Sequence, residues 1–196
     1  LLAVFLRNRI DNFFQEPSNI SKNLNLPILS HIPFLKEMDQ NQINILTKID
    51  QNGNKYNNLN SNNKYEFVES FRELYSSLRF HSNGNKMKSL VITSSIADEG
   101  KSLISLMLAK TLIDFDKKVL IIDADIRNPT LHSMLQKDNL IGFSNLLTDN
   151  TLTLKDVIQS NENSLSYEFI SAGSHYPNPS KLIESVRFKE VLEIIK

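Results

Sequence analysis

Two short segments of the sequence carry the side chains that could do chemistry. The first, residues 94–102, lies between an apolar run and a helical pattern. It ends in Gly100, Lys101 and Ser102, which match the end of a phosphate-binding loop, where backbone N–H groups, a lysine and a metal-binding hydroxyl surround phosphates. A helix that begins there favours an anion by about 0.3–1 kcal/mol. The segment predicts phosphate binding, although Ser95 replaces the usual first glycine; the alternative is an ordinary strand-to-helix turn with a surface lysine.

The second segment places two carboxylates directly after a strand. Residues 119–122 are all apolar, which is typical of a strand in a buried parallel sheet, and Asp123 and Asp125 follow them. Ligands of open α/β sheets bind at this edge. We expect Asp123 to hold Mg²⁺ or its water shell, and Asp125 to accept the proton of an attacking hydroxyl. The alternative is a polar strand end with Asp125 and Arg127 as a surface pair.

Hydrophobic periodicity predicts the elements that must position these side chains. Apolar residues recur at helical spacing from Phe67 to Leu78, and a second helix is predicted from Lys101 to about Phe115. Further strands are predicted at 90–93 and 169–171, with an edge strand at 28–32, and further helices at 129–136, 144–147, 154–159 and 180–196. A strand, a helix and a strand in this order form a βαβ unit, so the fold class is α/β, with a parallel sheet flanked by helices.

Composition excludes several classes of function. The chain has 196 residues, with 22 basic and 22 acidic side chains and no net charge, which argues against nucleic-acid binding by bulk electrostatics. It has no cysteine, so disulfide frameworks and zinc–thiolate sites are excluded. The four histidines are isolated and show no metal-ligand spacing.

Three regions are predicted along the chain. Residues 1–40 read as a juxtamembrane segment, because the apolar run 1–6 is followed by Arg7 and Arg9, as at the cytoplasmic end of a membrane span. The start of an amphipathic soluble helix is the alternative. Residues 41–63 read as an asparagine-rich linker, and residues 64–196 as the main domain.

The motifs resemble those of the bacterial tyrosine kinases of the polysaccharide co-polymerase type, the cytoplasmic domains of exopolysaccharide chain-length regulators. That family carries the loop T-S-x-x-P-G-E-G-K-S, which residues 93–102 match except at Ala97 and Asp98. Its second motif, an apolar run followed by D-x-D-x-R, is matched by residues 119–127. The Pro-Asn-Pro-Ser segment at 177–180 is also similar to the family.

The resemblance implies a P-loop NTPase-like fold and an ATP- and Mg²⁺-dependent protein-tyrosine kinase that regulates exopolysaccharide or capsule polymerisation and export. It implies that Lys101, Asp123 and Asp125 are catalytic and that Ser102 and Asp123 bind the metal. The residues implied for nucleotide binding are Glu99, Gly100, Lys101, Ser102, Leu103 and Arg127. The implied partners are tyrosines of the same or neighbouring subunits, the polysaccharide machinery and the bacterial inner membrane, with this part on the cytoplasmic side and no nucleic acid.

Two departures from the family pattern affect these expectations. Asp98 adds a negative charge near the phosphates, and repulsion of about 2–4 kcal/mol before screening leads us to expect that it points outward. The oligomerisation motif E-x-x-R-x-x-R appears as Glu69 and Arg72 followed by Tyr75 in place of the second arginine. We still expect a homo-oligomer.

The ends of the chain suggest a fragment of a longer protein. The family carries a further strand followed by D-x-P, whose aspartate completes the magnesium shell, and we expect this strand after Lys196. We therefore expect these 196 residues alone to lack kinase activity and to be poorly soluble.

Two other functions remain as alternatives. A non-catalytic, nucleotide-binding chain-length regulator is favoured by the replacements at Ala97, Asp98 and Tyr75. A partition-type ATPase is disfavoured, because that group needs a lysine where Ile96 stands.

Overall fold

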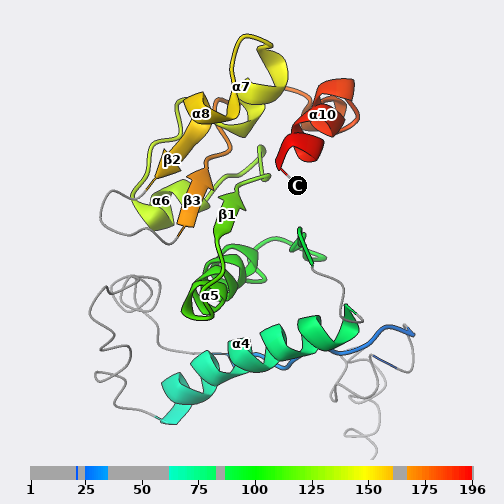
Figure 1. Ribbon diagram of the computed structural model, residues 1–196, viewed down its shortest axis with the longest axis vertical. Helices are drawn as coiled ribbons and strands as arrows, with labels where there is room; N and C mark the ends of the chain where they lie inside the picture. Colours follow the sequence, from blue (N-terminus) through cyan, green and yellow to red (C-terminus); the bar gives the residue numbers. More distant parts are fainter. Residues whose placement is uncertain (1–20, 22–24, 35–61, 83–86, 161–166, 196) are drawn as a thin grey trace, which may run out of the picture.

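The computed structural model describes residues 21, 25–34, 62–82, 87–160 and 167–195. In Figure 1 the sheet occupies one end of the molecule, and α5 lies between the sheet and α4. The elements are α4 (Asn62–His81), α5 (Lys101–Asp114), β1 (Val119–Ile122), α6 (Leu131–Leu135), α7 (Phe143–Thr148), α8 (Leu154–Val157), β2 (Ile158–Ser160), β3 (Tyr167–Ile170), α9 (Pro179–Ile183) and α10 (Val186–Ile195).

The sheet has the strand order β1-β3-β2. Strands β1 and β3 are parallel, with Ile121 opposite Phe169, so the parallel partner of β1 is β3 and not the segment 90–93 of the predicted βαβ unit. Strand β2 runs antiparallel to β3, so the sheet is mixed. The predicted helix at 154–159 ends at Val157, because residues 158–160 find hydrogen-bond partners on β3 and become a strand instead.

Helices cover both faces of the sheet. Ile121 and Phe169 belong to a buried cluster that includes Leu106 and Ala109 of α5. The next pair in the register, Ile122 and Ile170, packs on the opposite side, in a cluster with side chains of α7, α9 and α10. This alternation follows from the two-residue period of a strand. The predicted α/β architecture with flanking helices is therefore confirmed.

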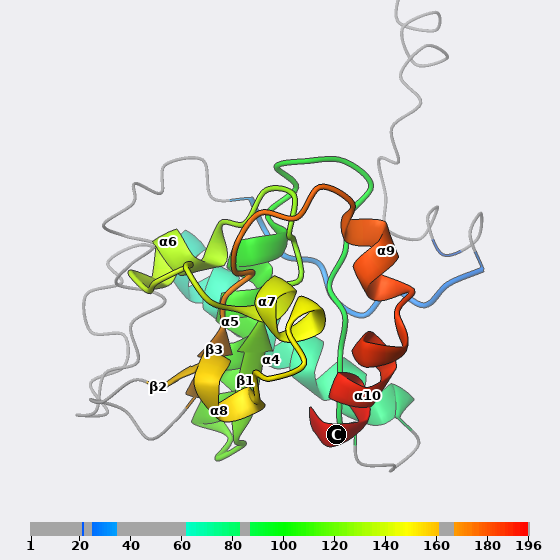
Figure 2. The same cartoon turned by 90° about the horizontal axis from the view of Figure 1, so that it is seen from above.

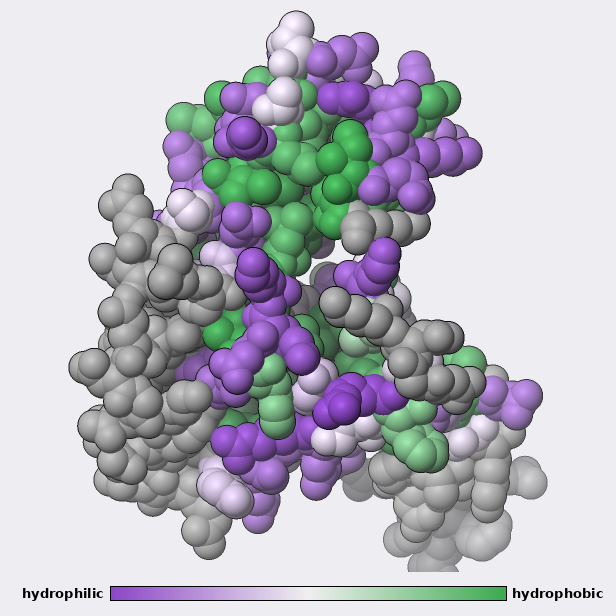
Figure 3. Space-filling model, viewed as in Figure 1, coloured by the Kyte–Doolittle hydropathy of each residue, from purple (hydrophilic) through white to green (hydrophobic). Residues whose placement is uncertain are grey.

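Helices α4 and α5 pack against each other through the predicted apolar stripe. Phe67, Phe71 and Leu78 of α4 join Met107 and Leu108 of α5 in one buried cluster. The surface in Figure 3 reflects this arrangement: apolar residues gather over the half that contains the sheet and α10, whereas hydrophilic residues predominate over α4 and α5.

The segment 25–34 is not the predicted edge strand. Leu29 and Ile32 pack against the α4–α5 cluster, and the Ser30 hydroxyl donates to the Ser70 carbonyl oxygen at 3.0 Å. Because these contacts are to a helix, they offer no ladder of backbone partners, and a strand exists only through such a ladder.

The prediction of a strand at 90–93 is also wrong. These residues have no strand partner in the described part of the chain, and Figure 2 shows the segment apart from the three strands. Leu90 and Val91 are 45% and 86% exposed, whereas Ile92 packs against the α4–α5 cluster. An apolar run favours a strand, but it becomes one only beside a neighbouring strand.

The predicted helix at 180–196 is two helices, α9 and α10. Ser185 separates them: its hydroxyl oxygen accepts the backbone N–H of Phe188 at 3.1 Å, which caps the start of α10. Asn178 caps α9 in the same way, through the N–H of Lys181 at 3.4 Å.

The end of β3 and the start of α7 form a buried polar junction, which we call the glycine junction (Gly142–Asn145 and Ser171–Ser174). The Asn145 side-chain oxygen accepts the N–H groups of Gly142 and Ser174, both at 3.0 Å. A Cβ on Gly142 would overlap the carbonyl oxygen of Ser171. The chain can therefore follow this path only with glycine at position 142.

Several sequence predictions lie outside the described residues. They are the apolar start at 1–6 and the asparagine-rich segment at 41–61. The regional bounds 1–40, 41–63 and 64–196 stay predictions. Among the helices that are described, none has both the length and the apolar character needed to cross a bilayer.

Candidate active site

Residues 94–100 form an irregular turn that leads into α5, as predicted for a phosphate-binding loop. Gly100 precedes the helix with φ +83°, a left-handed conformation that glycine adopts without strain. Its carbonyl oxygen accepts the N–H of Ile104 at 2.9 Å, which starts the helical hydrogen-bond pattern. A Cβ at position 100 would meet no atom within 4 Å, so the space beside this backbone is open.

Glu99 holds the loop through its own carboxylate. One carboxylate oxygen accepts the backbone N–H groups of Ser95 at 2.9 Å and Ile96 at 3.3 Å. Sequence reasoning assigned Glu99 to nucleotide binding, whereas the structure places its side chain on the loop backbone. The contact shows that N–H groups of this loop converge on an anionic oxygen.

Lys101 reaches back across the loop. Its ammonium group donates to the Ser94 hydroxyl at 3.0 Å, and that hydroxyl donates to the carbonyl oxygen of Ile96 at 2.7 Å. Leu103 packs its side chain against the α4–α5 cluster. The nucleotide binding predicted for Leu103 would therefore involve its backbone and not its side chain. The lysine is thus the cationic side chain of the described loop, held by a single neutral hydroxyl.

Asp98 adopts the left-handed backbone conformation that glycine adopts easily. It has φ +61°, a left-handed conformation that aspartate tolerates better than most residues, and it is exposed. The exposure agrees with the expectation that its carboxylate points away from the phosphates. Replacement of the family's glycine by Asp98 therefore changes the charge of the loop more than its backbone.

Asp123 lies at the end of β1 and is only 3% exposed. Its backbone N–H donates to the Ile170 carbonyl oxygen at 2.9 Å, so it closes the ladder to β3. Its two carboxylate oxygens accept the N–H groups of Asp125 at 3.1 Å and Leu131 at 3.2 Å. Burial raises the pKa of Asp123 above its usual value, although these two backbone hydrogen bonds act in the opposite direction.

Asp125 and Arg127 are exposed beside this buried carboxylate. Asp125 accepts the N–H of Asn128 at 3.0 Å, which closes a turn and leaves the side chain at the surface. Arg127 donates to the hydroxyl of Ser180 at 3.4 Å. The D-x-D-x-R segment therefore contacts the Pro-Asn-Pro-Ser segment, although the two are far apart in the sequence.

The phosphate loop and the aspartate segment meet at the start of α6. The hydroxyl oxygens of Ser102 and Thr130 are 2.6 Å apart, and the next residue, Leu131, donates its N–H to Asp123. Sequence reasoning missed Thr130, because its contact with Ser102 depends on the fold; only its preference for a helix N-cap was visible. Ser102 and Asp123 therefore contact neighbouring residues at the start of α6.

The donor set fits a magnesium ion that is bound together with phosphates. The described residues contain no group of three or more histidine or acidic side chains that could hold a metal by themselves. Ser102 and Asp123 carry oxygen atoms of the kind that Mg²⁺ prefers, and Mg²⁺ is usually bound by one or two carboxylates plus phosphates and water. A nucleotide with its metal therefore suits these residues better than a metal alone.

Glu69 and Arg72, the first two positions of the predicted oligomerisation motif, form an ion pair of 2.9 Å on α4. Both side chains are about 40% exposed. Tyr75, the third position, is buried, and its ring packs on Phe115 with a centroid distance of 4.8 Å. The tyrosine therefore fills the α4–α5 core instead of extending the charged surface.

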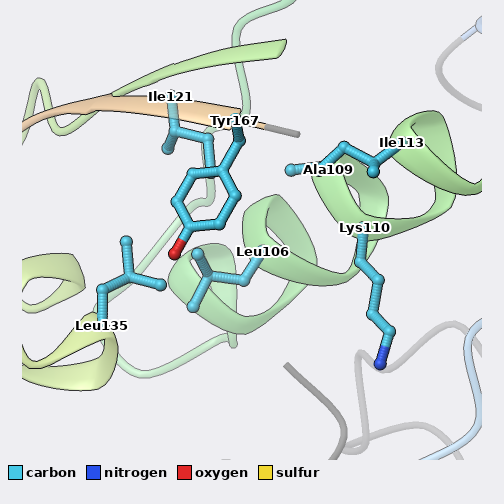
Figure 4. A pocket seen from close by; sticks show the side chains of 7 residues that line it. All are labelled: Leu106, Ala109, Lys110, Ile113, Ile121, Leu135 and Tyr167. Atoms are coloured by element: carbon cyan, nitrogen blue, oxygen red, sulfur yellow. The ribbon is translucent and has the colours of Figure 1, made fainter. Parts of the chain in front are cut away.

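A small pocket lies along α5 beyond the phosphate loop (Figure 4). Its lining is mainly apolar, with Leu106, Ile121 and Leu135 among the lining residues. Figure 4 shows the Tyr167 ring crossing the pocket and Lys110 pointing away from it. None of the predicted site residues lines this pocket, whose polar lining residues are Lys110 and Tyr167.

The chain is similar to proteins that are named tyrosine-protein kinases. No family model matches the chain. The chain is 36% identical over 123 residues to the tyrosine-protein kinase YwqD of Bacillus subtilis, which is 63% of this chain and 51% of YwqD. It is 32% identical over 192 residues to the tyrosine-protein kinase ptk of Acinetobacter johnsonii, which is 98% of this chain and 25% of ptk. The chain thus spans about half of YwqD and a quarter of ptk.

A solved structure supports the fold. The kinase domain of the Escherichia coli tyrosine kinase ETK matches 92% of this chain and 69% of that domain, with a TM-score of 0.72 and 28% sequence identity. The mixed sheet, the phosphate loop and the flanking helices therefore form a P-loop domain of the kind found in bacterial tyrosine kinases.

Proposed function

Because the chain belongs to the family of bacterial tyrosine kinases, we propose that it supplies the nucleotide-binding part of an ATP- and Mg²⁺-dependent protein-tyrosine kinase. The protein phosphorylates tyrosines of itself or of neighbouring subunits. It is attached to the bacterial inner membrane by a span that precedes these residues, with this part in the cytoplasm. Its activity regulates the polymerisation and export of an exopolysaccharide or capsule.

The observation that carries this proposal is the meeting of the two motifs at the start of α6. Ser102 contacts Thr130, and Asp123 accepts the N–H of the adjacent Leu131. A strand-to-helix turn with an unrelated surface lysine would not need a buried carboxylate beside it. The arrangement is the one expected where a phosphate loop and a metal-binding aspartate serve a single ligand.

The described residues suggest how the reaction proceeds. Asp125 accepts the proton of a tyrosine hydroxyl, the phenolic oxygen bonds to the γ-phosphorus, and the bond from that phosphorus to ADP breaks, which leaves phosphotyrosine and ADP. Lys101 exchanges its neutral partner Ser94 for a charged phosphate oxygen, and such charge-assisted hydrogen bonds are stronger. Ser102 and Asp123 would hold Mg²⁺, which would supply positive charge to offset the negative charge that develops on the phosphates.

Assembly into a homo-oligomer is part of the proposal. The ion pair of Glu69 and Arg72 lies on the exposed side of α4, where a second copy could contact it. Because Tyr75 is buried in the core, this contact rests on two charged residues and not on three.

The test is loss of nucleotide binding in the variant Lys101→Met. We expect a fluorescent ADP analogue, titrated with Mg²⁺ into the full-length protein, to bind the parent and to show no saturable binding to the variant. Lys155→Met, which removes an exposed lysine of α8, is the matched control and should bind like the parent. Equal affinity of Lys101→Met and the parent would contradict the phosphate-loop assignment.

A non-catalytic, nucleotide-binding regulator of polysaccharide chain length is the second candidate. The left-handed Asp98 favours it, because this carboxylate stands in the loop where the family has glycine. The two candidates differ in one measurement. A full-length protein that binds the ADP analogue normally and yet forms no phosphotyrosine from radiolabelled ATP would establish the regulator and exclude the kinase.

A further inference from the structure

The hydroxyl of Thr130 does not cap the helix that begins beside it. Thr130 is the N-cap residue of α6, and a threonine in this position usually accepts an N–H of the first helical turn. Here the side chain makes no such hydrogen bond, and α6 begins with the backbone bond from Met134 N–H to the Thr130 carbonyl oxygen at 3.2 Å. The hydroxyl lies instead 2.6 Å from the hydroxyl of Ser102.

Thr130 and its neighbour hold both oxygen ligands of the proposed metal site. Leu131 donates its backbone N–H to a carboxylate oxygen of Asp123 at 3.2 Å, while Thr130 contacts Ser102. Ser102 lies in the first turn of α5 and Asp123 at the end of β1, so these two ligands come from different elements. Two consecutive residues, Thr130 through its side chain and Leu131 through its backbone, therefore contact both proposed ligands.

We propose that Thr130 is a positioning residue of the magnesium site, whose hydroxyl accepts the proton of Ser102 and so turns a Ser102 lone pair toward the metal. A hydroxyl that ligates a cation must present a lone pair, and its proton then needs a separate acceptor. The distance of 2.6 Å lies within the usual range for a hydrogen bond between two hydroxyl groups. This inference rests on the proposed function, because it requires Ser102 to be a metal ligand.

A purely structural role fits the surroundings of Thr130 less well. The residue is exposed, so its side chain contributes little buried apolar area, and it does not cap α6. Loss of an outer hydrogen bond to a metal ligand typically costs about 10–100-fold in metal affinity. The effect of removing the hydroxyl should therefore appear in the dependence on Mg²⁺ and not in the stability of the fold.

The experiment measures binding of a fluorescent ADP analogue to the full-length protein over a series of MgCl₂ concentrations and in EDTA. In Thr130→Val, which keeps the shape but removes the hydroxyl, we expect the half-saturating Mg²⁺ concentration to rise about 10-fold or more. Affinity in EDTA should stay within about 2-fold of the parent. Thr130→Ser, which keeps a hydroxyl, should restore the parental Mg²⁺ dependence.

Thr153→Val is the matched control. Thr153 is the N-cap residue of another short helix, α8, and its hydroxyl donates to Asp156 at 2.6 Å, away from the site. This variant should leave the Mg²⁺ dependence unchanged. If Thr130→Val does not fold, Thr130→Ala carries the same expectation, and failure of both to fold makes Thr130 a structural residue and overturns the proposal.

The outcomes separate this inference from the proposed function. A parent protein that responds to Mg²⁺ while Thr130→Val responds identically overturns the role of Thr130 alone. An equal loss of affinity with Mg²⁺ and in EDTA also overturns it, because the residue would then act on the nucleotide site as a whole. A parent whose nucleotide affinity does not respond to Mg²⁺ overturns the metal site and this inference together.

Discussion

Gly100 in the phosphate loop and Gly173 in the glycine junction have nearly the same backbone conformation but opposite surroundings. Their φ angles are +83° and +82°. A Cβ at position 100 would meet nothing within 4 Å, whereas one at position 173 would meet the Gly142 nitrogen and the Ser144 hydroxyl oxygen at 2.8 Å and overlap the Asn145 side chain. The junction uses glycine to bring protein atoms together, whereas the loop uses it to keep space free for a ligand.

The largest effect is expected where alanine replaces these two glycines. Both variants carry the cost of a left-handed alanine, about 1–2 kcal/mol, so the difference between them reports the surroundings. Gly173→Ala should lower the free energy of unfolding by about 3 kcal/mol or more, because overpacking adds to that cost. Gly100→Ala should lower the free energy of unfolding only by the cost of the left-handed alanine, about 1–2 kcal/mol. Denaturant unfolding of both variants measures the difference.

Equal losses of stability in the two variants would show that the space beside Gly100 is filled in solution. The same proteins provide a second readout. Gly100→Ala should weaken binding of the ADP analogue, because its methyl group enters the space beside the loop backbone, while folded Gly173→Ala should bind normally.

The second effect is a loss of catalytic activity without a loss of stability. Asp125 is exposed, so Asp125→Asn should change the free energy of unfolding by less than about 0.5 kcal/mol. It should leave affinity for the ADP analogue within a few-fold and lower tyrosine phosphorylation by at least about 10²-fold, since a positioned general base contributes at least this much. Phosphotyrosine formation from radiolabelled ATP by the full-length protein is the measurement.

Asp138→Asn is the control for Asp125→Asn. Asp138 is also an exposed loop aspartate, and it accepts the N–H of Leu140 at 2.8 Å, much as Asp125 accepts that of Asn128. Its variant should phosphorylate like the parent. Unchanged phosphorylation in Asp125→Asn would show that another group accepts the proton.

The smallest effect is a pH dependence that differs in sign between two aspartates. Burial raises the pKa of Asp123, so its contribution to stability is fully present below about pH 3.8 and is lost as the pH rises through the higher pKa of the folded state. Asp123→Asn cannot ionise. Asparagine keeps only one of the two acceptor oxygens, which lowers stability at every pH. We therefore expect the stability of the variant relative to the parent to increase as the pH rises from about pH 4 to pH 7, measured by urea unfolding in EDTA without nucleotide.

Asp149→Asn is the opposite case. Hydrogen bonds from the Thr151 hydroxyl and backbone lower the pKa of Asp149, so its stabilising contribution is present above about pH 3.8 and is lost as the pH falls through the lower folded pKa. This variant should therefore lose stability relative to the parent at neutral pH. Parallel pH profiles for the two variants would contradict the assigned burial of Asp123.

Local sequence patterns predicted the helices and the strand that show a regular apolar pattern within their own residues. The apolar stripe of α4, the helix after Lys101 and the continuous apolar strand β1 all appear in the structure close to the expected bounds. The candidate site was predicted from similar local signals, a glycine before a helix and an aspartate after a strand. In the structure, Ser102 and Asp123 contact the neighbouring residues Thr130 and Leu131.

Features that depend on distant partners could not be predicted. Residues 90–93 have a strand-like composition but lack a neighbour, whereas residues 158–160 have little strand signal and pair with β3. Thr130 is a further example, because a hydroxyl shows its partner only when α6 is placed beside α5.

The two pairings of β3, with β2 and with β1, differ in how much chain must be closed to form them. Its pairing with β2 joins residues close in sequence, such as Ile158 and Ile170, whereas its pairing with β1 joins Val119 to Tyr167. Closing a loop about four times as long costs about 1.2 kcal/mol more in chain entropy, which slows the second pairing. The backbone bond from Asp123 to Ile170 belongs to that second pairing. We therefore expect the edge of the sheet that carries Asp123 to form after the outer hairpin during folding.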